Sequence, residues 1–204
     1  MAQYLYALGA GLGGMSAAPG GIVALKAVLT LADLAGCGVL LCLLRRLERP
    51  MTLAALYAWH PLPVLEIAGS GHVDGAGLAL FLLAMLMLTG RRPAPFLAGL
   101  ALAAAGLVKL FPLILAPAVV LAVPRQHGTI RRVGLGLIVG FVGLTAPFLP
   151  GVAQGLVSLG AYAREWEFAG LAFLVLRVLT GSGLVSRGML AGAFLSSLTL
   201  LWWR

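Results

Sequence analysis

The chain has 204 residues, of which 61% are hydrophobic and 10% are charged, and its formal net charge is +8. Soluble globular domains have about 45–50% apolar and about 25% charged residues, so this composition excludes an ordinary soluble domain. The apolar runs are continuous and rich in Leu, Ala and Gly, which predicts membrane-spanning helices. Basic residues lie in short clusters between these runs, as in membrane proteins, so we expect lipid partners and no nucleic acid. The sequence does not indicate an oligomeric state.

The apolar runs predict an all-α fold, a polytopic bundle with about seven to eight spans, some of them short or broken. In chain order we expect a possible interfacial helix over 1–20 and apolar runs over 22–44, 52–68, 75–90, 96–123, 133–149, 169–181 and 188–203. A span needs roughly 20 residues. The run 96–123 is interrupted near Lys109, and it is either a pair of short helices or one long kinked helix. Residues 1–204 are expected to form a single transmembrane domain, with an extracytoplasmic loop over 150–168.

The basic clusters predict the orientation of the chain in the membrane. They lie at residues 45–49, 91–92 and 125–132. The positive-inside rule favours the cytoplasm for all three, so an even number of crossings must separate each from the next. The turn 69–74, the break near Lys109 and the loop 150–168 are then expected on the extracytoplasmic side of the cell membrane.

Two charged residues lie within the first apolar span. A charge in the apolar core costs roughly 2.5–3.5 kcal/mol on insertion scales, so such residues are candidates for function. Lys26 and Asp33 are seven residues apart, which places them on one face of a helix. They either pair with each other or with neighbouring helices, or they belong to a site.

The turn 69–74, Gly-Ser-Gly-His-Val-Asp, is the most distinctive polar segment. Its glycines permit a tight backbone. Asp74 either caps the helix that follows or belongs to a site. His72, close to Asp74 and shortly after Glu66, suits proton transfer or the binding of sugar hydroxyls.

Two further segments carry charge next to a helix break or a span. Lys109 precedes Pro112 and either neutralises a phosphate or extends to the membrane interface. The segment 162–168, which begins at Tyr162, is either an aromatic belt or a loop that grips a lipid-linked or sugar ligand. In the second case Trp166 stacks on the ligand and Arg164 contacts a phosphate. No His/Cys cluster has metal spacing, and we expect neither a metal nor another cofactor.

Several of these segments also carry a family resemblance. They are 25–27 (Leu-Lys-Ala), 32–34 (Ala-Asp-Leu), 57–66 (Tyr-Ala-Trp-His-Pro-Leu-Pro-Val-Leu-Glu), 69–74, 107–112 (Leu-Val-Lys-Leu-Phe-Pro) and 162–168 (Tyr-Ala-Arg-Glu-Trp-Glu-Phe). In this order, over about residues 20–175, they resemble bacterial GT-C superfamily glycosyltransferases. The most similar are the polyprenyl-phosphate-mannose-dependent mannosyltransferases and glycosyltransferase family 87.

The resemblance implies transfer of a hexose such as mannose from a polyprenyl-phosphate sugar to an acceptor at the outer face. The residues expected to bind donor or acceptor are Glu66, His72, Asp74, Lys109, Tyr162, Arg164 and Trp166, with Lys26, Asp33 and His60 as secondary candidates. The family's catalytic carboxylate is expected upstream of Met1, and the chain is expected to be truncated at both ends. Two other functions stay open: a small transporter or channel lined by Lys26, Asp33, Glu66 and Arg177, and an inactive membrane partner.

Overall fold

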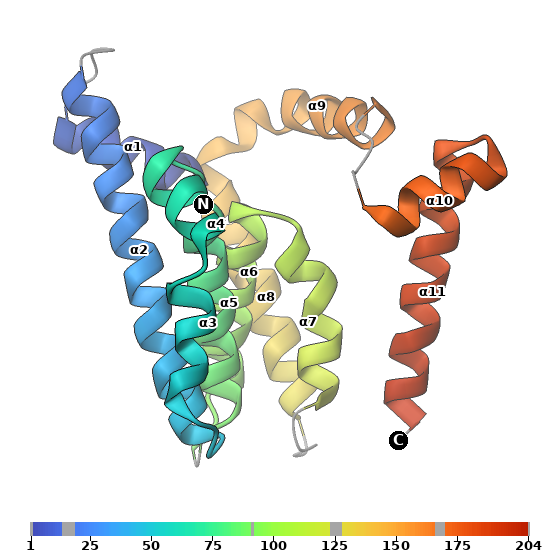
Figure 1. Cartoon of the computed structure of the whole chain (residues 1–204), viewed down its shortest axis with the longest axis horizontal. Helices are drawn as coiled ribbons and strands as arrows, with labels where there is room; N and C mark the ends of the chain where they lie inside the picture. The colour runs from blue at the N-terminus through green and yellow to red at the C-terminus, as the bar shows by residue number, and fades with distance from the viewer. Residues whose placement is uncertain (1, 14–18, 91, 123–127, 166–169, 204) are drawn as a thin grey trace. The chain divides into compact units, whose positions relative to one another are not determined.

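The structure is a computed structural model that describes all residues except 1, 14–18, 91, 123–127, 166–169 and 204 (Figure 1). The described elements are all helical, which confirms the expected fold class. They are α1 (Ala2–Gly13), α2 (Pro19–Arg46), η1 (Met51–Ala54), α3 (Ala55–Ala58), α4 (Pro61–Pro63), η2 (Val64–Gly69), α5 (Asp74–Leu88), α6 (Pro95–Val108), α7 (Phe111–Ala122), α8 (Thr129–Thr145), η3 (Ala146–Gly151), α9 (Val152–Glu165), α10 (Leu171–Thr180) and α11 (Gly183–Trp203).

The chain divides into two compact units, where the sequence predicts one transmembrane domain. The first unit covers Met1–Thr145 and the second covers Ala146–Arg204. The two units are treated separately below.

Three described helices are long and apolar enough to cross a membrane: Gly20–Arg46, Thr129–Gly151 and Gly183–Leu200. A fourth span results if the pair Pro61–Gly69 and Asp74–Leu88, bent by 117°, is counted as one. These helices make the chain a membrane-embedded protein by length and composition. The expected number of seven to eight spans stays a prediction.

Large apolar side chains on the outer faces of these helices agree with a lipid environment. In the first unit, α2 exposes Leu31 and Leu34, and α8 exposes Ile138 and Val142. Soluble monomers rarely expose large contiguous apolar patches. Hydrocarbon chains, in contrast, solvate such faces at no cost.

Helices α5, α6, α7 and α8 share the core of the first unit. Its buried members are Phe81, Ala84, Leu88, Ala98, Ala101, Leu102, Ala105, Ala116 and Val133. The backbones of α6 and α8 nearly touch, because an added Cβ at Gly99 would lie 2.2 Å from the Val133 carbonyl oxygen. At Gly136 it would lie 2.0 Å from the carbonyl oxygen of Phe96. Small residues allow this close packing, as in other membrane helix pairs.

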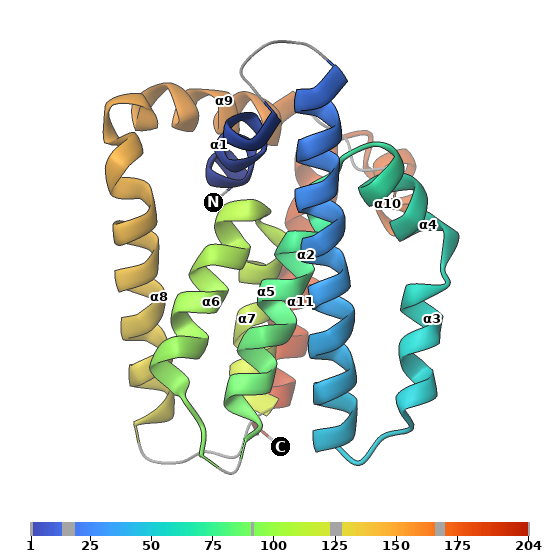
Figure 2. The ribbon, with the colours of Figure 1, turned by 90° about the vertical axis from the view of Figure 1, so that its left-hand side faces the viewer.

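The chain passes up and down through the first unit, so the helix ends that carry Arg45, Arg46, Arg131 and Arg132 lie at one end. Figures 1 and 2 show the C-terminal ends of α2, α5 and α7 and the start of α8 at the same end. The turn 69–74 and the break at Lys109 lie at the opposite end (Figure 2). This arrangement agrees with the even number of crossings that the basic clusters require.

The run 96–123 forms two helices that run in opposite directions, and not one kinked helix. In both views α7 returns beside α6 (Figures 1 and 2). An added Cβ at Gly106 would lie 2.3 Å from Cγ of Leu113, so the two helices pack tightly near the reversal. Pro112 is buried in the first turn of α7, where its missing N–H costs nothing.

Two other segments differ from the expectation. The run 52–68 is not one helix, since it is broken at Trp59 and His60 into η1, α3, α4 and η2. Pro61 explains the break, because the residue before a proline is disfavoured in the helical region. The expected loop 150–168 is instead helical from Val152 to Glu165, forming α9 in the second unit. Apolar residues at helical spacing along 152–165 explain this helix.

Candidate functional site

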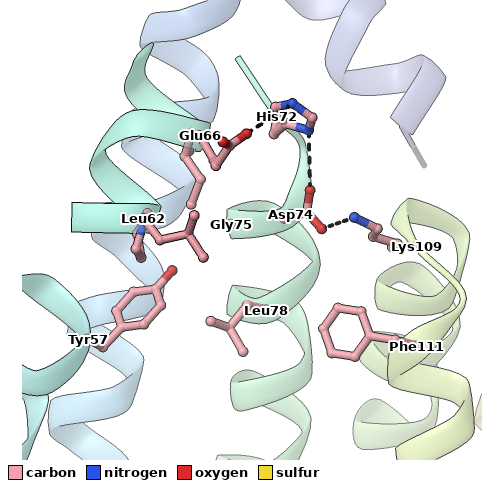
Figure 3. A pocket seen from close by; sticks show the side chains of 11 residues that line it. Tyr57, Leu62, Glu66, His72, Asp74, Gly75, Leu78, Lys109 and Phe111 are labelled. Atoms are coloured by element: carbon pink, nitrogen blue, oxygen red, sulfur yellow. Dashed lines mark hydrogen bonds and ion pairs between the residues drawn. The ribbon is translucent and has the colours of Figure 1, made fainter. Parts of the chain in front are cut away.

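A pocket of about 420 Å³ opens in the first unit beside the turn 69–74 (Figure 3). It is lined by Tyr57, Leu62, Pro63, Glu66, Ile67, His72, Asp74, Gly75, Leu78, Lys109 and Phe111. Figure 3 shows the polar side chains gathered at one end and Tyr57, Leu78 and Phe111 at the other. We call it the polar pocket. It has the size of a small-molecule site, and it is amphiphilic.

An unusual turn positions the histidine of this pocket. Residues Val64–Gly69 form a π-helix, and the His72 amide then donates to the Glu66 carbonyl oxygen at 2.9 Å. Gly71 lies between them with φ of +77°, a left-handed conformation that glycine adopts without strain. The backbone therefore folds back, and the His72 ring lies beside the Glu66 side chain.

Four ionisable side chains form a continuous chain across the polar end. Nε2 of His72 lies 3.2 Å from Oε2 of Glu66, and its Nδ1 lies 3.7 Å from Oδ2 of Asp74. The other oxygen of Asp74 accepts a hydrogen bond from Nζ of Lys109. These side chains are 36–54% exposed, so solvent or a ligand can reach all four.

The charges of this group nearly balance. The carboxylates of Glu66 and Asp74 outnumber Lys109 by one, so the group carries one negative charge with neutral His72 and none with protonated His72. The ammonium group of Lys109 is therefore already paired with a carboxylate. An anionic ligand must compete with Asp74 for the ammonium group.

Asp74 does not cap α5. It is the first residue of the helix, and the N-cap position is Val73, which makes no side-chain cap bond. The Asp74 carboxylate instead faces His72 and Lys109 (Figure 3). A negative charge in the first turn is also favoured by the helix dipole. The structure thus argues against a capping role for Asp74, and its part in a site stays a prediction.

Lys109 reaches the polar pocket because α6 ends at Val108, the residue before it. Its backbone is extended (φ −152°, ψ 145°) and forms the C-cap of α6. Its side chain reaches the N-terminal end of α5 and pairs with Asp74. The Lys109 side chain is thus turned toward Asp74, whereas one of the two sequence alternatives extended it to the membrane interface.

Lys26 and Asp33 each bond to a neighbouring element, and not to each other. Nζ of Lys26 donates to the Gly69 carbonyl oxygen at 2.5 Å, which satisfies an acceptor at the end of η2. Oδ1 of Asp33 accepts from the hydroxyl of Tyr57 at 2.5 Å. Both residues lie outside the pocket lining and hold its walls in place.

Of the remaining expected site residues, only His60 has a described side chain, and it is not part of the pocket lining. His60 caps α4, because its Nδ1 accepts from the amide of Leu62 at 3.2 Å. Tyr162 and Arg164 belong to α9 in the second unit, and their side chains lie outside the described part. Trp166 lies outside the described residues altogether.

The sequence prediction omitted the apolar wall of the pocket. Tyr57, Leu62, Leu78 and Phe111 line it, yet none was among the predicted site residues. The signal was present for the two aromatic residues, because Tyr57 and Phe111 lie four residues and one residue before a proline, next to the helix breaks at 59–60 and 109–110.

Fold and pocket together define a membrane-embedded helical protein with an amphiphilic pocket at one end of its first unit. Within the described residues, no group of three or more His, Cys, Asp or Glu side chains is arranged to hold a metal ion. Comparison with protein-family models, curated proteins and solved structures found no match.

Proposed function

We propose that the chain is a membrane glycosyltransferase module whose polar pocket binds the head of a polyprenyl-phosphate sugar. The observation that carries the proposal is the pairing of two surfaces in one pocket. An ionisable group, Glu66–His72–Asp74–Lys109, lies directly above an apolar wall. A sugar phosphate on an isoprenoid chain needs both.

The donor phosphate binds at Lys109 and His72. A phosphate oxygen replaces the Asp74 carboxylate as the acceptor from Lys109, and protonated His72 supplies a second donor. Two cationic donors then face the single negative charge of the phosphodiester, and the carboxylates of Glu66 and Asp74 offset the remaining positive charge. The exposure of both side chains allows this exchange without unfolding the turn.

The carboxylates bind sugar hydroxyls. Once Lys109 turns to the phosphate, Asp74 is free to accept from a hydroxyl of the sugar or of the acceptor, and Glu66 offers the same chemistry beyond His72. We assign these residues to binding and orientation.

The apolar wall receives the first isoprene units. Tyr57, Leu78 and Phe111 present carbon surfaces below the polar group (Figure 3). The volume of about 420 Å³ suits a hexose phosphate with the start of a chain, and leaves the rest of the lipid in the bilayer.

The transfer takes place at the extracytoplasmic face of a bacterial cell membrane, with a mannose-like hexose as the transferred group. The position of the pocket supports this side, since the C-terminal end of α2 and the start of α8, which carry basic residues, lie at the other end of the first unit. The family resemblance supports the class of donor and the hexose.

The test uses the full chain in nanodiscs with polyprenyl-phosphate mannose that carries a photoreactive group. Lys109→Ala and His72→Ala are expected to weaken saturable labelling about 10-fold or more, since each removes a charge-assisted hydrogen bond. His60→Ala and Arg132→Gln are the controls, because neither side chain lines the pocket. Equal labelling of wild type, Lys109→Ala and His72→Ala would contradict the proposal.

A further inference from the structure

The first unit has a second pocket at its basic end, of about 1100 Å³. It lies between the C-terminal ends of α2 and α5 and the start of α6. Arg45, Arg46, Glu48 and Arg92 give it charge, and Leu83 and Leu86 are among its apolar walls. We call it the basic pocket. Helix α5, with 15 residues and thus about 22 Å of length, separates it from the polar pocket.

The charges of the basic pocket are not balanced internally. Three arginines face one carboxylate, and no ion pair joins Glu48 to any of them in the described part of the chain. Exposed arginines keep their charge at any physiological pH. The pocket therefore has an excess of two positive charges and attracts an anion.

The way in which α2 ends places two of the arginines at the basic pocket. The Arg49 amide donates to the Leu44 carbonyl at 2.9 Å and the Glu48 amide to the Arg45 carbonyl at 3.3 Å, which is a Schellman ending. Glu48 takes the left-handed position with φ of +54°. The chain turns away there, and the last helical turn leaves Arg45 and Arg46 at the pocket.

Arg46 bridges two helices. Its Nη1 donates to the Leu86 carbonyl oxygen, late in α5, at 2.5 Å. Gly90 makes room for it, since an added Cβ there would lie 3.1 Å from the same nitrogen. The guanidinium group is thus held in place before any ligand arrives, with nitrogen donors left over.

We propose that the basic pocket binds the phosphate headgroup of an anionic phospholipid. The depth supports a lipid, because the pocket lies at the end of α2, a helix long enough to cross a membrane. Headgroup phosphates lie at that depth. Guanidinium groups bind phosphate with two parallel hydrogen bonds, which a cluster of arginines can offer from several sides.

The apolar walls favour a lipid over a soluble phosphate compound. Leu83, Leu86, Met87 and Leu97 line the same pocket as the arginines. They give the upper part of an acyl chain a surface next to its own headgroup. A soluble phosphate would leave this surface unused.

The test measures lipid selectivity of the full chain in phosphatidylcholine nanodiscs, with spin-labelled phosphatidylglycerol or spin-labelled phosphatidylcholine as the probe. The pocket variant is Arg45→Gln with Arg92→Gln, which spares the bridging Arg46. The matched control is Arg131→Gln with Arg132→Gln, which removes two charges near the same end but outside the pocket. We expect the preference for phosphatidylglycerol to fall about 5-fold or more in the pocket variant and less than about 2-fold in the control.

A second variant is expected to raise the affinity for the anionic lipid, a result that loss of folding could not produce. Glu48→Gln removes the carboxylate of the pocket, and the preference for phosphatidylglycerol should rise about 2-fold or more. Equal falls in the two double variants would overturn the proposal, since loop charge alone would then explain the preference. Displacement of the bound lipid by millimolar glycerol phosphate would also overturn it, because a soluble phosphate would then be the ligand.

Discussion

The hydroxyl of Tyr57 donates a hydrogen bond of 2.5 Å to Oδ1 of Asp33 and ties α3 to the middle of α2. Both side chains are half-buried. Tyr57 also lines the polar pocket, so a carboxylate inside a candidate membrane span holds one wall of that pocket. The bond gives Asp33 a positioning role, which the sequence left open.

Tyr57→Phe should lower the free energy of unfolding by about 1 kcal/mol, because it leaves the Asp33 carboxylate without its donor. Denaturation of the purified chain in mixed micelles measures this loss. A double-mutant cycle with Asp33→Ala isolates the pair, and we expect a coupling energy of about 0.5 kcal/mol or more. Additive losses in the double mutant would show that the two side chains do not interact.

Gly136→Ala should destabilise the first unit by about 1–3 kcal/mol, since the new methyl group would lie 2.0 Å from the Phe96 carbonyl oxygen and force α6 and α8 apart. Gly143→Ala is the matched control on the same helix. Nothing lies within 4 Å of its added Cβ, so it should be neutral or stabilise by up to about 1 kcal/mol. Denaturation of both variants in micelles provides the comparison. The same loss from both would mean that α6 and α8 do not pack as described.

Gly71→Ala should reduce donor binding, because alanine is strained at φ of +77° and the turn that places His72 must shift. Gly128→Ala serves as the control, with a similar φ of +84° and open space around it. Both variants should lose about 1 kcal/mol of stability in micelle denaturation. Only Gly71→Ala should lower photolabelling by the donor. Equal labelling of the two variants would show that the conformation of the turn at Gly71 does not affect donor binding.

The orientation of the chain can be tested by cysteine accessibility. In a background with Cys37 and Cys42 replaced by serine, single cysteines at positions 72, 109 and 164 should react with a membrane-impermeant maleimide added from the extracytoplasmic side. A cysteine at position 131 should react only after the membrane is opened, since it belongs to a basic cluster. Protection of position 72 or 109 in intact cells would place the polar pocket on the other side.

Composition and the basic clusters were enough to predict the helical class and the up-and-down course of the first unit. The sequence left two alternatives open for 96–123, and the structure shows the reversal near Lys109 that returns the chain to the basic end. The broken course of 52–68 was harder to foresee. Its apolar composition predicts one span, but Pro61 and Pro63 interrupt the helix. Helix α9 was missed because its polar residues read as a loop, whereas its apolar residues recur at helical spacing.

The site was predicted in part. The sequence singled out Glu66, His72, Asp74 and Lys109, and the structure joins them in one group. The pairing of Lys109 with Asp74 could not be predicted, because it depends on how the end of α6 meets the start of α5, 35 residues earlier. The apolar wall escaped notice for a related reason. In a sequence that is mostly apolar, a leucine that faces a pocket cannot be told from one that faces lipid.

The most direct test of the central claim is to map where the photoreactive polyprenyl-phosphate mannose attaches. After labelling in nanodiscs and proteolysis, mass spectrometry locates the modified residues. We expect attachment within residues 57–78 and 109–111, competed by unmodified donor and lost in Lys109→Ala. Attachment only in other segments, or attachment in these segments that unmodified donor does not reduce, would contradict the account.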